Sequence, residues 1–223
     1  MEPRVLQELG HGPVTLEQAL QHLNLDLDGD SPPDHPDGQL VERLLRAAVR
    51  SVEKYTERRL IAVELELPLN CLPSVWCAGD RWAWTGQPRT DRSGVPLPGA
   101  PLHEVSSVTY VDTNGDTQTV DPASYQVDDF SEPGRLLWSR TATCPTVNRD
   151  VPNPVRVIYS AGYVDPNDTG DGPLCPEPLA SAVLLMLGHL YENREVVVIG
   201  TITAELPLSV QYLLRPYKLH LGY

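Results

Sequence analysis

The sequence of 223 residues predicts an α+β fold, in which a small helical bundle is interrupted by a β-rich insertion. Residues 40–60 and 178–195 carry apolar side chains at helical spacing and predict two long helices, with a shorter helix near each end of the chain. The segments between them alternate with period two or are rich in Pro and Gly, as strands and loops are. We therefore expect N-terminal helices of the core (1–60), a β-rich insertion (61–163), and C-terminal helices with a tail (164–223).

A short helix is expected near the N-terminus. Thr15 can cap it, and Gln18 stands three residues later, where it completes a capping box. An apolar stripe follows at helical spacing, formed by Leu16, Ala19, Leu20 and Leu23. Residues 24–37 are rich in Asp and Pro and lack periodicity, which predicts a loop.

The first long helix, residues 40–60, is expected to follow Asp37 as its N-cap. Its buried face is predicted to consist of Val41, Leu44, Leu45, Ala48, Val52 and Tyr55. A second face is basic and consists of Arg43, Arg46, Arg50 and Lys54. Two interpretations stay open: the basic face is solvated and paired with nearby Glu residues, or it contacts an acidic neighbour or passing phosphates.

The insertion begins where the apolar period changes to that of a strand. Ile61, Val63, Leu65, Leu67 and Leu69 alternate with polar or small residues, so a strand should follow the helix directly. Asn114-Gly115 predicts a tight turn that joins strands 105–112 and 117–120 in a hairpin. Further strands are expected at 125–128, 135–138 and 155–159.

Residues 70–100 form a long irregular stretch that contains Trp76, Trp82 and Trp84. A loop of this length inside a compact domain is usually functional. The three indole rings suit two interpretations equally, as anchors of an interface or as a small local core.

The second long helix, residues 178–195, has Pro in its first turn. Its buried stripe is predicted to consist of Ala182, Leu185, Met186, His189 and Leu190, so His189 should be a core residue. A last helix at 208–214 ends before Pro216. The final residues Leu213, Leu214, Tyr217, Leu219, Leu221 and Tyr223 are too apolar for a free tail. We expect a partner or a neighbouring subunit to cover them.

Composition excludes several function classes. A formal net charge of −13 disfavours tight binding of nucleic acid, although it permits a protein past which DNA slides. No run of about 18 apolar residues predicts a membrane span, and the first residues lack the pattern of a secretory signal. We expect reduced thiols, with Cys71–Cys77 or Cys144–Cys175 disulfides as alternatives.

The chain carries no phosphate loop, dinucleotide fingerprint or serine-nucleophile elbow. Acidic loops at residues 26–37 and 165–176 fail the calcium-loop pattern at their last ligand position. We therefore expect no enzymatic activity, no metal and no cofactor.

Six segments, taken in order, resemble the head–tail connector (adaptor) proteins of long-tailed double-stranded DNA phages. AAVRSVEKYTERRLI (47–61) is similar to the family's Ala-rich helix, which ends in Glu-x-Tyr-Thr-x-Arg-x-Leu and runs into a strand. PLPGAPLHEVSSVTYVDTNGD (96–116) is similar to its strand and hairpin. The others are SYQVD (124–128), VRVIYSAGY (155–163), PEPLASAVLLMLGHLYENRE (176–195) and ELPLSVQYLLRPYK (205–218). The Trp-rich insert at 70–95 is longer than the family's pattern.

The resemblance implies a structural subunit of a ring, commonly of twelve copies. Such a ring binds the portal protein, extends the channel through which genomic DNA passes without sequence-specific binding, and provides a platform for the stopper or tail-completion protein. It implies a place in the virion, at the head–tail interface, after assembly in the host cytoplasm.

The resemblance also implies roles for the candidate residues. The basic face (Arg43, Arg46, Arg50, Lys54) would meet the next subunit or the channel, and the three Trp residues would face outward or towards the tail. The apolar C-terminal residues would dock on the portal or a neighbour, so removing residues 216–223 should abolish attachment and leave the fold intact. An alternative function, suggested by the basic face, is a DNA-binding accessory factor of packaging.

Overall fold

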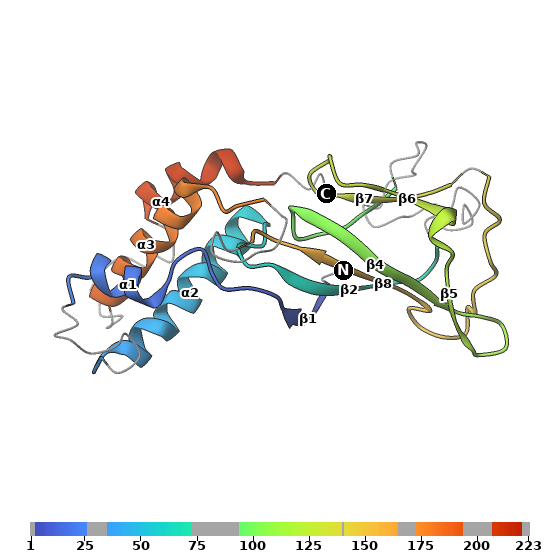
Figure 1. The fold of residues 1–223 in the computed structure, drawn as a ribbon, viewed down its shortest axis with the longest axis horizontal. Coiled ribbons are helices and arrows are strands. Elements are labelled where there is room, and N and C mark those ends of the chain that lie inside the picture. The colour runs from blue at the N-terminus through green and yellow to red at the C-terminus, as the bar shows by residue number, and fades with distance from the viewer. Residues whose placement is uncertain are drawn as a thin grey trace, which may run out of the picture.

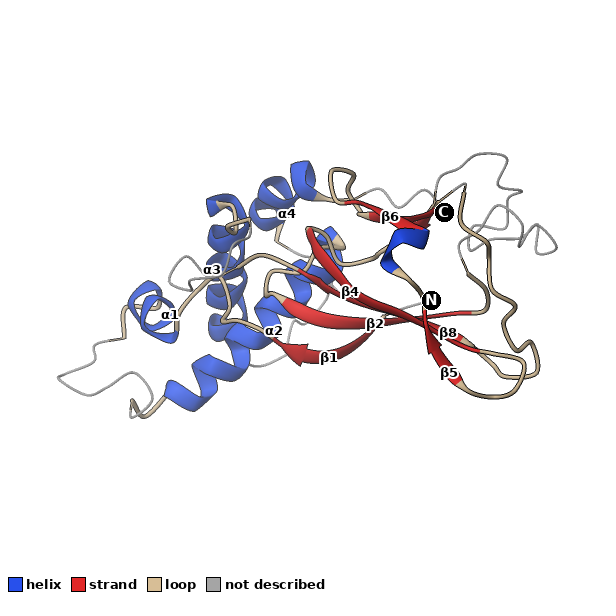
Figure 2. Cartoon of the chain, turned by 45° about the vertical axis from the view of Figure 1, so that its right-hand side comes forward, coloured by secondary structure: helices blue, strands red, loops and turns tan. Residues whose placement is uncertain are grey.

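The computed structural model describes residues 3–25, 35–72, 94–139, 141–164, 173–193 and 207–219. The helices gather at one end of an elongated molecule and the strands at the other (Figure 1). The same separation is visible when the chain is turned and coloured by secondary structure (Figure 2). The predicted α+β class is confirmed.

In the described part of the chain the α-helices are α1 (Leu16–His22), α2 (Gly38–Thr56), α3 (Glu177–Glu192) and α4 (Leu208–Leu214). A 3-10 turn, η3 (Arg215–Tyr217), continues α4. The helices share one core, whose fully buried members include Leu20, Val41, Ala48, Val52, Leu179, Val183, Leu187, Val210 and Leu214. Burial of these side chains stabilises the helical end, since each buried aliphatic group contributes about 1.5–3 kcal/mol.

Local chemistry sets the start of α1. The Gln18 N–H donates to Thr15 Oγ1 at 3.2 Å, and the Thr15 N–H donates to Gln18 Oε1 at 3.0 Å. These two bonds form the predicted capping box, which satisfies backbone donors that a helix start leaves unpaired.

The ends of α2 differ from expectation. The helix stops at Thr56, because Glu57 takes the left-handed conformation (φ 59°) and interrupts the helical hydrogen bonds. Asp37 precedes the helix as predicted, but its side chain makes no capping bond. Instead it accepts a hydrogen bond from the Tyr191 hydroxyl at 3.3 Å, which ties the end of α3 to the start of α2.

The predicted buried stripe of α3 is wrong in part. Ala182 is buried, but Leu185 is 39% exposed and His189 is exposed. The buried face instead runs through Leu179, Ala182, Val183 and Leu187. Apolar residues surround this helix on most sides, so their spacing does not single out one face.

The strands form two antiparallel sheets. The larger has the order β1 (Arg4–Glu8), β2 (Val63–Leu69), β8 (Val155–Ala161), β4 (Leu102–Val111) and β5 (Thr117–Thr119). The smaller has the order β3 (Val95–Pro96), β7 (Arg135–Trp138) and β6 (Tyr125–Asp128). A second core joins them, and its fully buried members include Leu65, Leu67, Leu97, Leu136, Val155, Val157 and Tyr159.

Most predicted strands are present within a few residues of their expected bounds. The alternation in β2 matches its burial, with Val63, Leu65, Leu67 and Leu69 turned inward. The predicted hairpin joins β4 to β5, and Gly115 has the positive φ (93°) that its turn requires. β1 is a strand that the sequence did not predict, because most of its side chains are exposed and show no apolar alternation.

Candidate interaction surfaces

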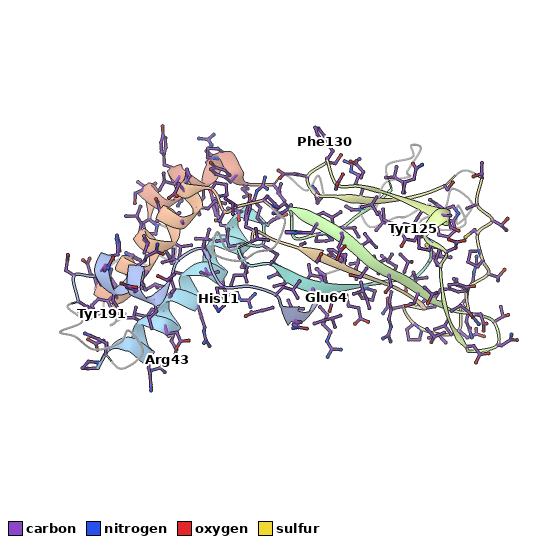
Figure 3. The ribbon with its side chains drawn as sticks, in the orientation of Figure 1. His11, Arg43, Glu64, Tyr125, Phe130 and Tyr191 are labelled. Carbon is purple, nitrogen blue, oxygen red and sulfur yellow. The ribbon has the colours of Figure 1, made fainter. Side chains whose placement is uncertain are left out.

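The basic face of α2 is exposed: Arg43, Arg46, Arg50 and Lys54 all reach solvent. Arg43, which belongs to this basic face, is labelled in Figure 3. The Arg43 Nε–H donates to the Gln39 carbonyl oxygen at 3.4 Å. In the described part of the chain, neither Arg43 nor Lys54 forms an ion pair. Positive charge is therefore available at both ends of this face.

The two central arginines are paired within the chain. Arg46 pairs with Glu42 one turn earlier on α2. Arg50 lies 3.0 Å from Glu8 of β1 and 3.3 Å from Glu53. Arg46 remains 75% exposed and Arg50 53% exposed, so these pairs contribute little to stability and leave both guanidinium groups accessible.

Glu53 holds the end of α2 in place. Its carboxylate is only 6% exposed and accepts a hydrogen bond from the Leu60 N–H at 2.9 Å. The same group lies 3.3 Å from both Arg50 and Arg59. A buried carboxylate is tolerated only with such donors. Glu53 therefore fixes the turn that leads from α2 to the sheet.

Arg58 joins the helical end to the sheets. It is 8% exposed, and its guanidinium donates to both carboxylate oxygens of Glu132, at 2.9 and 2.5 Å. Nε–H donates to the Tyr217 carbonyl oxygen at 2.7 Å, and Nη1–H donates to the Tyr163 hydroxyl at 3.4 Å. One side chain thus links the exit of α2, the β6–β7 loop, the segment after β8, and η3.

Both members of this pair are charged. The hydrogen bond from Arg58 lowers the pKa of the Glu132 carboxyl, against the opposing effect of its partial burial. Burial lowers the pKa of Arg58, but the hydrogen bonds and charges of Glu132 and Tyr163 together outweigh it and raise that pKa overall. Arg58 was not among the predicted site residues, and it faces its own chain.

The C-terminal residues expected at a docking surface belong largely to the chain's own core. Leu214 is fully buried and Leu219 is 8% exposed, while Leu213 and Tyr217 pack against the helical core. The Leu219 N–H donates to the Thr56 carbonyl oxygen at 3.0 Å, so this segment folds back on the end of α2. In this conformation Leu214 and Leu219 are not accessible to a partner.

Other predicted positions lie outside the described residues. These are Trp76, Trp82 and Trp84 of the insert, and Leu221 and Tyr223 of the tail. Their roles stay predictions. The calcium-loop patterns at residues 26–37 and 165–176 fall mostly in the same undescribed ranges.

Among the described residues, three large apolar side chains are far more exposed than the others: Phe130 at 98%, and Leu208 and Tyr212 at 82% each. Leu208 and Tyr212 share one face of α4. Phe130 projects from the β6–β7 loop (Figure 3). None of these residues was predicted from the sequence, although an aromatic side chain inside the acidic loop Asp-Asp-Phe-Ser is a recognisable signal.

The loop that presents Phe130 has a defined conformation. Asp128 accepts hydrogen bonds from the Phe130 N–H at 3.2 Å, the Ser131 N–H at 3.1 Å and the Ser131 hydroxyl at 2.6 Å. These bonds, first of all that from the Ser131 hydroxyl, lower the pKa of the Asp128 carboxyl. The aromatic ring therefore stands on a hydrogen-bonded turn.

Within the described ranges, no group of three or more His, Cys, Asp or Glu is placed to hold a metal ion. No helix among those residues combines the length and the apolar character needed to cross a bilayer. Burial raises the pKa of the Cys175 thiol to about 12. Because Cys175 is a thiol, the alternative Cys144–Cys175 disulfide is not formed.

No family model and no curated protein matches this chain. Its fold is similar to that of a chain from the neck of an empty gene transfer agent (GTA) particle computed with C6 symmetry, with a TM-score of 0.67 and 21% identity, covering 100% of this chain and 99% of that one. A chain from the neck of the native GTA particle computed with C12 symmetry has a TM-score of 0.62 and 21% identity, covering 100% of this chain and 99% of that one.

A chain from the virion of a native GTA particle gives a TM-score of 0.63 and 19% identity, covering 97% of each chain. The similarity spans the helical end and both sheets, since almost no part of either chain is left out. This chain therefore has the fold of a component found in the necks of phage-like particles.

Proposed function

We propose that this chain is a structural subunit of a head–tail connector (adaptor) ring in a phage or phage-like particle. In this role it binds the portal protein, extends the DNA channel, and provides a platform for the stopper or tail-completion protein. It needs no catalytic site, metal or cofactor. It resides in the virion at the head–tail interface after assembly in the host cytoplasm.

One observation carries the proposal. The fold matches a neck chain over the full length of both molecules, and two of the matched necks have C6 and C12 symmetry. A ring of about twelve copies agrees with that symmetry, because head-to-tail contacts of identical subunits close into a cyclic assembly.

The surface of the subunit supports a binding role. Phe130, Leu208 and Tyr212 expose large apolar groups that are accessible to a partner. The exposed basic face of α2 provides an accessible charged surface as well. Together they offer distinct contacts for identical and for different partners.

Portal attachment can be tested by sedimenting the chain with its portal assembly. The wild-type chain should cosediment, and a chain that ends at Leu219 should lose attachment without losing stability. A chain that ends at Arg215 should also be less stable, because Arg58 and Thr56 lose their partners in Tyr217 and Leu219. A wild-type chain that stays in the supernatant would contradict the proposal.

The exposed basic face of α2 favours one alternative, a DNA-binding accessory factor of packaging. That function requires duplex binding with a Kd of about 10⁻⁶ M or tighter and a steep dependence on salt. The net charge of −13 and the internal ion pairs of Arg46 and Arg50 predict much weaker binding. A titration of duplex DNA at two salt concentrations separates the two functions.

A further inference from the structure

We propose that the β6–β7 loop, residues 128–134, docks on the basic face of α2 in a second copy of this chain, with Phe130 as its apolar anchor. The inference rests on the proposed ring function and assigns the contact between neighbouring subunits. It uses two surfaces that lie apart on one molecule. Each is defined by described residues.

Phe130 is suited to anchor a contact with a second copy. At 98% exposed it is the most exposed large apolar side chain among the described residues. Val127, at 38%, adds apolar surface on the adjoining strand. Asp128 fixes the turn through three hydrogen bonds, so docking the aromatic ring orders little additional chain. Preorganised aromatic anchors of this kind commonly dominate the energy of an interface.

Charge complementarity identifies the partner. The loop carries Asp128, Asp129 and Glu132 and no basic residue. Asp128 is engaged by its own turn and Glu132 by Arg58, whereas Asp129 is exposed and forms no ion pair within the described part of the chain. An acidic tip with an apolar anchor suits a basic surface whose side chains can also pack on an aromatic ring.

The basic face of α2 has that chemistry. It presents four basic side chains, of which Arg43 and Lys54 form no ion pair among the described residues. Two copies of a chain with net charge −13 repel each other on average. Contact between them therefore requires a local match of opposite charge, and this face provides one.

The positions of the two surfaces fit a ring. Phe130 and Arg43 project from opposite flanks of the molecule (Figure 3). β6 is also an edge strand of the smaller sheet, which places the loop at the periphery. A contact between two different patches on opposite flanks is heterologous, and repeating it generates a closed ring when the rotation allows.

Tyr212 provides a matched control. It is an aromatic residue that is 82% exposed, on the α4 sequence Leu208–Leu214, which carries no charged residue. It therefore lacks the charge match to α2. Phe130→Ala should raise the concentration for half-assembly about tenfold or more, whereas Tyr212→Ala should change it by less than about threefold.

The experiment measures assembly of the full chain by mass photometry and sedimentation velocity, alone and with portal, and records thermal unfolding of every variant. Asp129→Lys should weaken assembly, as should Arg43→Glu or Lys54→Glu. Combining Asp129→Lys with Arg43→Glu or with Lys54→Glu should restore part of the loss in at least one pair. None of these exposed substitutions should lower the midpoint of unfolding appreciably.

Two results overturn the inference while leaving the ring proposal standing. One is a Phe130→Ala chain that assembles like wild type, or less impaired than Tyr212→Ala. The other is a failure of both charge-exchange pairs to restore assembly. A wild-type chain that never assembles, with or without portal, overturns the ring proposal itself and this inference with it.

Discussion

Replacing Arg58 with Met removes the side chain that joins the helical end to the sheets. The Met side chain is of similar length, but it cannot form the two hydrogen bonds to Glu132 or the hydrogen bond to the Tyr217 carbonyl oxygen. Removing one partner of a buried ion pair costs about 3–5 kcal/mol. Glu132 is 46% exposed and can be rehydrated, so we expect a smaller loss of about 2–3 kcal/mol in the free energy of unfolding.

Thermal unfolding followed by circular dichroism measures this loss. For a chain of this size about 1 kcal/mol shifts the midpoint by about 2–4 °C, so Arg58→Met should lower it by roughly 5–10 °C. Arg46→Met is the matched control, because Arg46 is 75% exposed and pairs, among the described residues, only with Glu42. Its effect on the free energy of unfolding should stay below about 0.5 kcal/mol. Equal unfolding midpoints for Arg58→Met and wild type would show that Arg58 does not hold the helical end to the sheets.

Three further predictions follow from individual sites. The pKa of Glu132 is lowered in the folded chain, so its pairing with Arg58 stabilises the fold above the unfolded-state pKa of about 4.3 and loses this effect as the pH falls through the folded-state pKa. The difference in thermal unfolding midpoint between wild type and Glu132→Gln should therefore be steady from neutral pH down to about pH 5 and shrink below about pH 4. A difference that stays unchanged in acid would argue against this pairing. Gly162→Ala should lower the free energy of unfolding by about 3 kcal/mol or more, because Gly162 has φ +119° and a Cβ there would lie 2.2 Å from a backbone carbonyl oxygen. Gly10→Ala is the control: Gly10 has open space around it, so this substitution should be near neutral when both variants are unfolded by a denaturant titration. Leu187→Ala should lower the free energy of unfolding by about 2–5 kcal/mol and Leu185→Ala by less than about 1 kcal/mol, since Leu187 is fully buried and Leu185 is 39% exposed. The reverse order in urea unfolding would mean that Leu185 lies on the buried face of α3, as the sequence predicted.

The parts of the fold predicted from sequence are those that local chemistry determines. The capping box at Thr15 and Gln18 needs only residues three positions apart. The β4–β5 turn needs the positive φ of Gly115, and the burial of β2 follows from strict alternation. In each case the sequence window contains every group that makes the contact.

The contacts of Arg58 could not be predicted from local sequence. Arg58 meets Glu132 across 74 positions of sequence and Tyr217 across 159, so no local pattern connects them. The C-terminal residues were expected at a partner surface because they are apolar. An apolar residue is equally suited to the chain's own core, and only the fold decides that Leu214 and Leu219 lie there.

The exposure of Phe130 was also not predicted. Phe130 is a lone aromatic residue in a polar loop, and its exposure depends on how the β6–β7 turn projects from the smaller sheet. The four basic residues of α2 were found because helical spacing gathers them on one face. The pairing of Arg50 with Glu8 became visible only in the fold, which places β1 beside α2.

Electron microscopy of the chain assembled with its portal protein decides whether the chain forms a connector ring. We expect a closed, rotationally symmetric ring of about twelve copies, coaxial with the portal, with a continuous central channel. A chain that remains monomeric in the presence of portal, or that decorates the portal without closing into a ring, would contradict it.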